Sequence, residues 1–408
     1  MIGAGAAGLL AAARAAERGR PTVLLEKNTK PGVKILMSGG TRCNLTHATD
    51  RRGIVQAFVE TCGRGGQFLH GPLAALGPEE LVALFEAEGV ATKTEPTGKI
   101  FPQSDRALDV QRALVRRLQR CGGDLRLGHA VTNITATEGG GLCVATDRGD
   151  WQASRVILTT GGMSYPGCGT TGDGYAWAKQ LGHRIVPPRP ALVPLTSDVA
   201  WVRELQGVTL PDVAVRVTQT NETKSSRLRS HRGGLLFTHF GLSGPTAMNA
   251  SRAVTLRPDA DDWRLECDFV PDLPRQQIEE QLGDRRAGGK SVLQVVAAWA
   301  PRSVAESLVT QAELPPDHRL AELSKASRRR LVDAVKQTMI PIAGTLGFKK
   351  AEVTTGGVDL AGVDSRTMHS RCCPGLLLAG EVLDLDGPIG GYNFQAAFST
   401  GWLAGENV

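Results

Sequence analysis

The chain has 408 residues, of which 41% are hydrophobic and 22% are charged, as in an ordinary globular enzyme of two or three domains. Its 47 basic and 41 acidic residues leave a net charge of +6, which is too small and too dispersed to indicate a nucleic-acid partner. None of the eight cysteines forms a C-x-x-C pair, and the sequence shows neither a secretory leader nor an apolar run of membrane-spanning length. These features predict a cytoplasmic protein with no metal site and no membrane contact.

The first nucleotide-binding signal lies at the N-terminus, where Gly3, Gly5 and Gly8 spell G-x-G-x-x-G. A strong helix is predicted over 6–19, followed by a short buried strand over 21–27 that contains Glu26, 18 residues after Gly8. Gly3 permits a tight turn, Gly5 lets a pyrophosphate approach the backbone, and Gly8 lets the helix pack closely on the sheet. The helix N-terminus attracts phosphates, and a carboxylate such as Glu26 suits ribose hydroxyls. The motif predicts a dinucleotide site but does not distinguish FAD from NAD.

The strand expected before this motif is unusually short. A β-strand commonly has about five or six residues, and only Met1 and Ile2 precede Gly3. Either the natural chain continues upstream, or a two-residue stub suffices because its neighbouring strands are long. We expect the first, with a few apolar residues before Met1.

The remaining elements are predicted from periodicity and from glycine and proline positions. In chain order we expect a loop-rich stretch over 28–47, a helix over 77–90, a hairpin over 92–102, a helix over 104–123 and short strands over 125–158. Beyond these we expect strands over 201–269, helices over 273–339, and buried strands with a final helix over 348–408. The proline-rich stretch 183–195 marks entry into a second domain. The pattern is an α/β domain that is interrupted by an insertion and completed by the C-terminus.

Four further glycine-rich segments carry a family resemblance: "SGGTRCNLTH", "LTTGGMSYPGCGTTGDGYAWAKQLGH", "FTHFGLSGP" and "LLLAGEVLDLDGPIGGYNFQAAFSTG". With the N-terminal motif and Glu26, they resemble, in order and over nearly the whole chain, the YhiN-like (BaiN/RdsA-type) FAD-dependent oxidoreductases. The resemblance implies an α/β fold with a glutathione-reductase-like, Rossmann-type FAD-binding domain in two segments. The implied FAD-binding domain consists of residues 1–190 and 346–408, and its second segment first returns along the edge of the barrel. Between these segments the resemblance implies an inserted β-barrel-like domain over 191–270 and a helical insert over 271–345.

The resemblance also implies which residues hold a non-covalent FAD. The glycine loop would line the pyrophosphate, Glu26 the adenosine ribose, the segment 39–44 the pyrophosphate and flavin, Val131 the adenine, Glu381 the ribityl chain, and 391–393 the flavin pyrimidine. The full implied set is Gly3, Gly5, Ala6, Ala7, Gly8, Glu26, Lys27, Lys34, Ser38, Gly39, Gly40, Arg42, Cys43, Asn44, Val131, Thr160, Gly161, Gly162, Gly380, Glu381, Asp386, Gly390, Gly391, Tyr392 and Asn393.

The sequence departs from the family pattern in two further places. It has "GGTRCN", with Thr41 where a third glycine is usual, and "TTGG", with Thr159 where an alanine is usual. Both changes add only a small side chain, and we expect them to disturb the site little.

Several residues admit more than one interpretation. Arg42 is either a surface charge or, as its glycine and asparagine neighbours favour, a phosphate contact. Cys43 lacks the second cysteine of a redox dithiol, which favours a packed residue near the flavin. His239 is a weak candidate for a catalytic proton donor, and a structural barrel histidine is an equally good interpretation. A second G-x-G-x-x-G at 167–172 follows no strand directly, so we predict no separate nicotinamide domain.

The predicted function is hydride transfer between flavin N5 and an unidentified small organic substrate, with NAD(P)H as the reductant implied by the family. One alternative is an oxidase of a small amine or ketone that uses oxygen. Another is a flavin-dependent tRNA-modifying or RNA-binding protein, which the mild charge and the 5% aromatic content argue against. The sequence does not indicate an oligomeric state.

Overall fold

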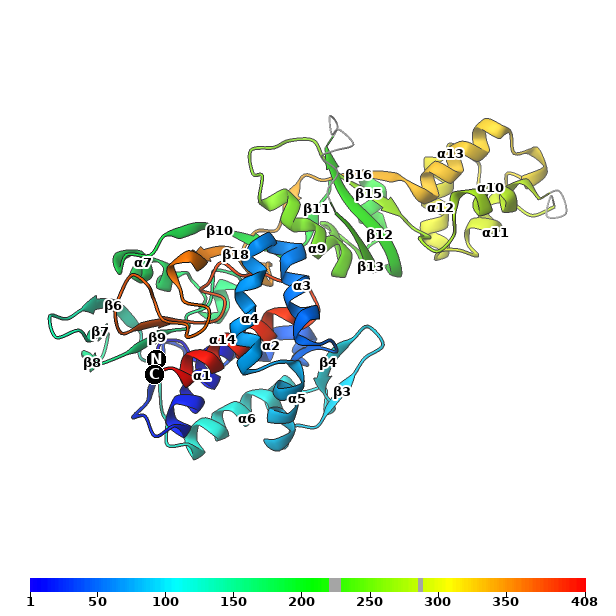
Figure 1. Ribbon diagram of the computed structural model, residues 1–408. Coiled ribbons are helices and arrows are strands. Elements are labelled where there is room, and N and C mark those ends of the chain that lie inside the picture. The colour runs from blue at the N-terminus through cyan, green and yellow to red at the C-terminus, as the bar shows by residue number, and fades with distance from the viewer. Residues whose placement is uncertain (220–228, 285–288) are drawn as a thin grey trace. The chain divides into compact units, whose positions relative to one another are not determined.

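The computed structural model describes residues 1–219, 229–284 and 289–408, and its chain divides into two units (Figure 1). Unit 1 comprises Met1–Pro190 and Glu352–Val408, and unit 2 comprises Ala191–Ala351. The chain therefore leaves unit 1 once and returns to it for its last segment. None of the helices in the described ranges is both long and apolar enough to cross a membrane.

Unit 1 is built on a parallel sheet in which the N-terminal stub takes the place of a strand. β1 (Val23–Glu26) pairs with β5 (Asp124–Leu127), and β9 (Val156–Leu158) pairs with β19 (Leu376–Leu378). Ile2 forms parallel bridges to Leu25 on one side and Leu158 on the other. The backbone N–H groups of Ile2 and Gly3 donate to Ile157 and Leu25 at 3.0 and 2.8 Å. Two residues thus connect the halves of the sheet in the order β5–β1–Ile2–β9–β19.

Two helices rich in small residues lie beside this sheet. α1 (Ala6–Glu17) is buried along most of its length, as its alanine-rich sequence predicts. The C-terminal helix α14 (Tyr392–Glu406) packs directly on it, because a Cβ added at Gly401 would lie 2.4 Å from the Ala7 carbonyl oxygen. Glycine at position 401 therefore sets how closely the two ends of the chain approach.

The other helices and strands of unit 1 surround this core. They are α2 (Val33–Thr41), β2 (Thr46–His47), α3 (Arg51–Cys62), α4 (His70–Ala75), α5 (Pro78–Ala87), β3 (Thr92–Thr94), β4 (Lys99–Pro102), α6 (Ala107–Arg120), β6 (Val131–Ala136), β7 (Leu142–Thr146), β8 (Trp151–Ala153), α7 (Asp173–Gln180), β10 (Ile185–Ala191) and β18 (Val353–Val358). Strands β2, β4 and β3 form one antiparallel sheet, and β6, β7 and β8 form another. The predicted helices at α5 and α6 and the hairpin of β3 and β4 are confirmed.

Helix α2 corrects the expectation of an irregular stretch over 28–47. It begins after Gly32, whose φ of 64° places it in the left-handed region, and its first residues are the apolar run V-K-I-L-M. The helical geometry then breaks at Ser38, Gly39 and Gly40. The sequence does not reveal this helix, because about one and a half helical turns are too few to show a hydrophobic periodicity.

Unit 2 holds a seven-stranded antiparallel sheet and a group of helices (Figure 1). The strand order is β16–β15–β12–β13–β14–β11–β17. The strands are β11 (Leu195–Thr196), β12 (Thr209–Gln219), β13 (Ser230–Thr238), β14 (Gly241–Ser243), β15 (Trp263–Asp268), β16 (Thr338–Pro341) and β17 (Gly344–Thr345), and the helices are α8 (Ala200–Glu204), α9 (Gly244–Thr255), α10 (Arg275–Gly283), α11 (Val292–Val296), α12 (Arg302–Gln311) and α13 (Lys325–Lys336).

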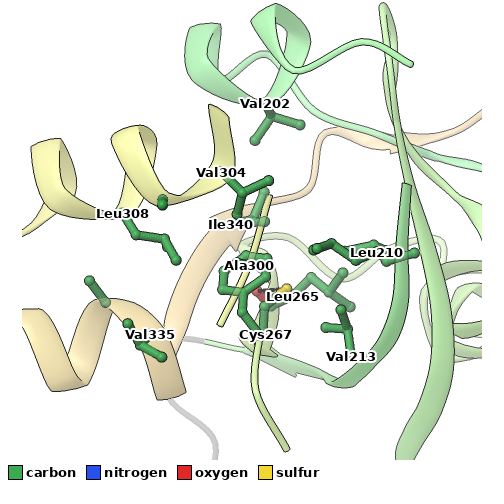
Figure 2. Close-up of a cluster of buried hydrophobic side chains, with 14 of the residues drawn as sticks. Val202, Leu210, Val213, Leu265, Cys267, Ala300, Val304, Leu308, Val335 and Ile340 are labelled. Atoms are coloured by element: carbon green, nitrogen blue, oxygen red, sulfur yellow. Dashed lines mark hydrogen bonds between the residues drawn. The ribbon is translucent and has the colours of Figure 1, made fainter. Parts of the chain in front are cut away.

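The core of unit 2 joins this sheet to its helices. Figure 2 shows Val213 of β12 and Leu265 of β15 in the same cluster as Val304 of α12 and Val335 of α13. All four side chains are at most 1% exposed. The sheet and the helices that follow it in sequence consequently share one hydrophobic core rather than two.

Candidate active site

The chain segments with the predicted site residues meet at one edge of the parallel sheet. Glu26 ends β1, Gly3 follows the bridging Ile2, Thr160 follows β9, and Gly380 follows β19. Because these strands are parallel, their carboxyl ends share an edge, which is where open α/β sheets bind ligands. The topology thus brings four separate sequence motifs to one place.

The glycine loop has two crowded positions and one open one. Gly3 has a φ of 98°, and a Cβ there would lie 2.7 Å from the Thr159 carbonyl oxygen. A Cβ on Gly8 would lie 1.9 Å from the Gly3 carbonyl oxygen, whereas a Cβ on Gly5 would meet no atom within 4 Å. Gly5 is the N-cap of α1, and no side chain caps that helix. The first N–H groups of α1 therefore lie beside open space, as a phosphate site requires.

The Glu26 carboxylate lies against the same loop. It is 8% exposed, and its two oxygens accept hydrogen bonds from the backbone N–H groups of Ala4 at 2.7 Å and Asn28 at 2.9 Å. The Glu26 carbonyl oxygen accepts from His129 N–H at 2.9 Å, two residues before Val131. The predicted ribose acid and the predicted adenine segment are therefore neighbours through this backbone contact.

A second cluster surrounds Glu381. One carboxylate oxygen pairs with Lys34 Nζ at 2.5 Å, and the other accepts from Ser164 Oγ at 2.9 Å and Thr354 N–H at 2.8 Å. Lys34 Nζ also donates to Ser164 Oγ at 2.7 Å. Sequence reasoning chose Lys34 and Glu381 but missed Ser164 and Thr354. Both lie in glycine-flanked stretches, "TTGGMSYPG" and "VTTGG", and that neighbourhood is the signal that could have indicated them.

A third cluster holds the N-terminus of α14. In the amide orientation that matches the surrounding donors and acceptors, the Asn44 side-chain oxygen accepts from Gly391 N–H at 2.9 Å, and its nitrogen donates to the carbonyl oxygens of Thr46 and Ile100. The ring of Tyr392 stacks on His47 with centroids 4.7 Å apart. Asn44 and the glycine turn, predicted separately, are thus in direct contact, while His47 was missed.

Other predicted residues have structural partners in the same unit. Asn393 bonds the backbone of Gly387 through both of its side-chain polar atoms, at 2.8 and 3.0 Å. Gly380 N–H donates to Thr400 Oγ1 at 3.0 Å, and Asp386 is 1% exposed. A Cβ on Gly162 would lie 2.4 Å from Thr354 Oγ1. These positions support the loops after β9 and β19.

Backbone hydrogen bonds to one carbonyl group hold the end of α2 and the residues just after it. The Ser38 carbonyl oxygen accepts from the backbone N–H groups of Arg42 and Cys43. Cys43 is fully buried, and burial raises its pKa to about 12, so its thiol stays neutral at physiological pH. A neutral packed thiol is not a reactive nucleophile, which agrees with the expectation of a packed residue.

Three predicted residues contact groups other than this sheet edge. Arg42 pairs with Glu95 at 2.7 Å on the hairpin of β3 and β4. Lys27 pairs with Asp173 at 2.5 Å. His239 is exposed in the turn between β13 and β14 of unit 2, with its ring against Phe240.

The residues at the sheet edge fit a dinucleotide. Open glycine positions at Gly5 and Gly40, where a Cβ would meet no protein atom, leave the backbone accessible. An uncapped helix N-terminus offers N–H donors for a pyrophosphate, and the neighbouring carboxylate of Glu26 suits a ribose. These three features belong to one compact unit.

Comparisons with known proteins agree with this geometry. Residues 1–407 match the model described as "HI0933-like protein Rossmann domain". The chain is 32% identical to the ribosomal RNA dihydrouridine synthase of Escherichia coli and 30% identical to the 3-dehydro-bile acid delta(4,6)-reductase of Clostridium scindens. Each alignment covers 100% of this chain and 97% of the relative. The fold is similar to that of a 3-ketosteroid delta1-dehydrogenase from Sterolibacterium denitrificans, with a TM-score of 0.51, 15% identity and coverage of 99% and 98% of the two chains.

The match over the whole length confirms the family resemblance that the glycine segments indicate, and with it the α/β class and the Rossmann-type FAD-binding domain. The chain belongs to the HI0933-like family, and it is an FAD-dependent oxidoreductase.

Proposed function

We propose that this enzyme is a reductase that saturates a carbon–carbon double bond conjugated to a carbonyl group. The observation that carries the proposal is the full-length similarity to two enzymes with different substrates. Dihydrouridine is uridine with its C5–C6 double bond reduced, and that bond is conjugated to a carbonyl. The two double bonds of a delta(4,6) 3-dehydro steroid are likewise conjugated to the ketone. The shared chemistry is hydride addition to the far carbon and protonation of the carbon next to the carbonyl.

The residues at the sheet edge would bind FAD along its length. The uncapped N-terminus of α1 and the open face of Gly5 receive the pyrophosphate, and Glu26 accepts from the adenosine ribose. Glu381, held by Lys34, Ser164 and Thr354, has about one of its four lone-pair sites left for a ribityl hydroxyl. When bound, FAD supplies the hydride chemistry, and the chain supplies binding and orientation.

The N-terminus of α14 would lie at the flavin end. Asn44 fixes the Gly391 N–H, and Gly391 can only be glycine because a Cβ there would lie 2.4 Å from the Thr46 carbonyl oxygen. A helix N-terminus in this position stabilises negative charge on a reduced ring. Asn44 therefore acts by holding the turn from which the helix starts.

We propose that NAD(P)H is the reductant and that it binds only transiently. The second glycine motif, at 167–172, begins inside a short 3-10 turn (Pro166–Cys168) and not directly after a strand. Among the described residues, the strand–turn–helix arrangement of a dinucleotide fold is therefore built around the N-terminal motif.

Two substrates of this chemical type are candidates. A uridine in ribosomal RNA is favoured by the relatives from E. coli and Haemophilus influenzae, at 32% and 30% identity. A small unsaturated ketone is favoured by the bile-acid enzyme, at 30%. The net charge of +6 by itself indicates no nucleic-acid partner, whereas the two ribosomal RNA enzymes among the relatives favour testing RNA first.

The test has two stages. The purified protein is loaded with FAD, and the flavin absorbance is followed anaerobically with NADH and with NADPH. The reduced enzyme is then mixed with ribosomal RNA transcribed without modifications, or with 4-androstene-3,17-dione, and re-oxidation and products are measured. We expect either that dihydrouridine forms in the RNA or that the carbon–carbon double bond of the steroid next to its 3-ketone is reduced. A flavin that is re-oxidised by oxygen but by neither compound would support the oxidase alternative instead.

A further inference from the structure

Residues 39–43, at the irregular end of α2 and just after it, form a loop with a run of left-handed residues. Gly39 and Gly40 have φ of 55° and 67°, and Thr41 and Cys43 have φ of 68° and 63°. A β-branched residue rarely adopts this region, because its Cβ crowds the backbone. Thr41 therefore holds a backbone conformation that favours glycine, although its side chain is β-branched.

The side chain of Arg42, the residue after Thr41, connects this loop to the neighbouring hairpin of β3 and β4. Arg42 pairs with Glu95 at 2.7 Å and with Asp105 at 3.4 Å. Its guanidinium also lies over the ring of Phe101, 3.9 Å from the ring centroid. These partners come from the turn between β3 and β4, from β4 itself and from the residues just after it.

Phe101 links the two ends of the loop. Its side chain is 2% exposed and lies under the Arg42 guanidinium, while a Cβ on Gly39 would approach its ring edge at 3.1 Å. One buried ring thus contacts both Gly39 and Arg42. A change of backbone conformation in the loop would therefore alter the packing of Gly39 or Arg42 on this ring.

We propose that Arg42 is a positioning residue, which holds the left-handed loop 39–43 against the hairpin, and not a ligand of the cofactor phosphate. The proposal rests on the proposed function only in that FAD lies along this loop. It replaces the phosphate contact that the sequence suggests with a contact inside the protein.

The local charges agree with this role. Arg42 and Lys93 contribute two positive charges, and Glu95 and Asp105 contribute two negative charges, within one bonded group. An approaching phosphate would meet a cluster that is already neutral, with carboxylate oxygens facing the guanidinium. Backbone N–H groups in left-handed conformations can bind anions without any side-chain charge.

The test measures FAD affinity by flavin fluorescence for the wild type, Arg42→Gln, Glu95→Gln, Thr41→Gly and the double variant Thr41→Gly/Arg42→Gln, at low and high salt. Arg52→Gln, an exposed arginine on α3, is the matched control. We expect Arg42→Gln to weaken FAD binding by about tenfold, which is the size of effect that the strain of one left-handed residue can produce. Thr41→Gly should restore most of that loss, because glycine keeps the loop conformation without the tether.

The two roles of Arg42 predict opposite outcomes for the other arms. A positioning role predicts that Glu95→Gln also weakens FAD binding and that Arg42→Gln leaves its salt dependence unchanged. A phosphate ligand predicts that Glu95→Gln strengthens binding, that Arg42→Gln flattens the salt dependence, and that Thr41→Gly gives no rescue, and this result would overturn the proposal. Unchanged FAD affinity with a lower melting temperature in Arg42→Gln would also overturn it, since the tether would then be unrelated to the site. The wild-type arm separately tests the cofactor itself.

Discussion

Gly5 and Gly8 belong to one motif but meet different surroundings, and a matched pair of substitutions separates their roles. In Gly8→Ala the new Cβ would lie 1.9 Å from the Gly3 carbonyl oxygen, so the turn must open and the fold weakens. In Gly5→Ala the new Cβ meets no protein atom and the φ of −82° suits alanine, so the protein without cofactor keeps its stability. We expect Gly5→Ala to lose FAD binding while its melting temperature stays unchanged. We expect Gly8→Ala to lose FAD binding and also to have a lower melting temperature. Calorimetry and fluorescence titration measure the two quantities, and a destabilised Gly5→Ala would contradict this account.

Glu26 is the second test at this scale. Replacing it by glutamine removes the charge that strengthens a hydrogen bond from a ribose hydroxyl. We expect Glu26→Gln to lose about 1.5–3 kcal/mol of FAD binding free energy, the usual value for a hydrogen bond to a charged group. Glu138→Gln, an exposed carboxylate after β6, is the control and should bind FAD as the wild type does. Equal affinities for both variants would show that Glu26 serves only the backbone N–H groups of Ala4 and Asn28.

At the scale of elements, a buried carboxylate joins two helices of unit 1. Glu88, at the end of α5, is bonded to Arg117 and Arg120 of α6, and its side chain is 4% exposed. Hydrogen bonds from the two guanidinium groups, that of Arg120 first, hold the pKa of this carboxyl below its ordinary value of 4.5. A lowered pKa in the folded state means that ionised Glu88 stabilises the fold.

The ion pairs of Glu88 with Arg117 and Arg120 make the stability of the fold depend on pH. The contribution of Glu88 is fully present above about pH 4.5 and is lost as the pH falls through its folded-state value. We expect Glu88→Gln to lower the free energy of unfolding by about 2 kcal/mol at pH 7, and the difference from wild type to shrink as the pH falls below 4.5. Urea unfolding across this range measures it, with Glu79→Gln, exposed on the same helix, as the control. A difference that persisted at low pH would place the effect in packing and not in charge.

At the scale of the whole molecule, each unit has its own hydrophobic core. The core in Figure 2 lies entirely within unit 2, and the proposed FAD-binding residues at the sheet edge lie in unit 1. A ligand that binds one folded unit stabilises that unit by mass action. We expect calorimetry to resolve two transitions, with FAD at a hundred times its Kd stabilising the one for unit 1 by about 2.7 kcal/mol. A single transition that FAD shifts as a whole would instead show that the two units unfold together.

Much of the fold could be predicted because its signals are local. The helices α1, α5 and α6 follow from composition, glycine stops and apolar spacing, and α14 follows from the glycine turn before it. The short helix α2 could not, because its few residues carry no period. The same locality explains why the sequence alone indicates Glu26 and Gly391 as candidates, since each stands beside a recognisable turn.

The partners of the site residues could not be predicted in this way. Ser164 and Thr354 are 190 positions apart, and both meet Glu381 only because β9, β18 and the end of β19 come together. Arg42 was assigned to a phosphate from its neighbours in sequence, while its bonded carboxylates lie 53 and 63 positions away. The local sequence indicates which residue is a candidate for the site, but it does not determine which distant side chain that residue contacts.

The sequence by itself determined the chemistry of this protein: a glycine turn before a helix, an acid at a strand end and the glycine segments that mark a flavoprotein family. These signals are local because backbone conformation and helix ends depend on residues a few positions apart. Only the tertiary structure decided which side chains are occupied by other protein groups and which positions stay open. Packing and charge pairing act across the whole chain, so Gly5 is open and Arg42 is bonded for reasons that no short segment contains.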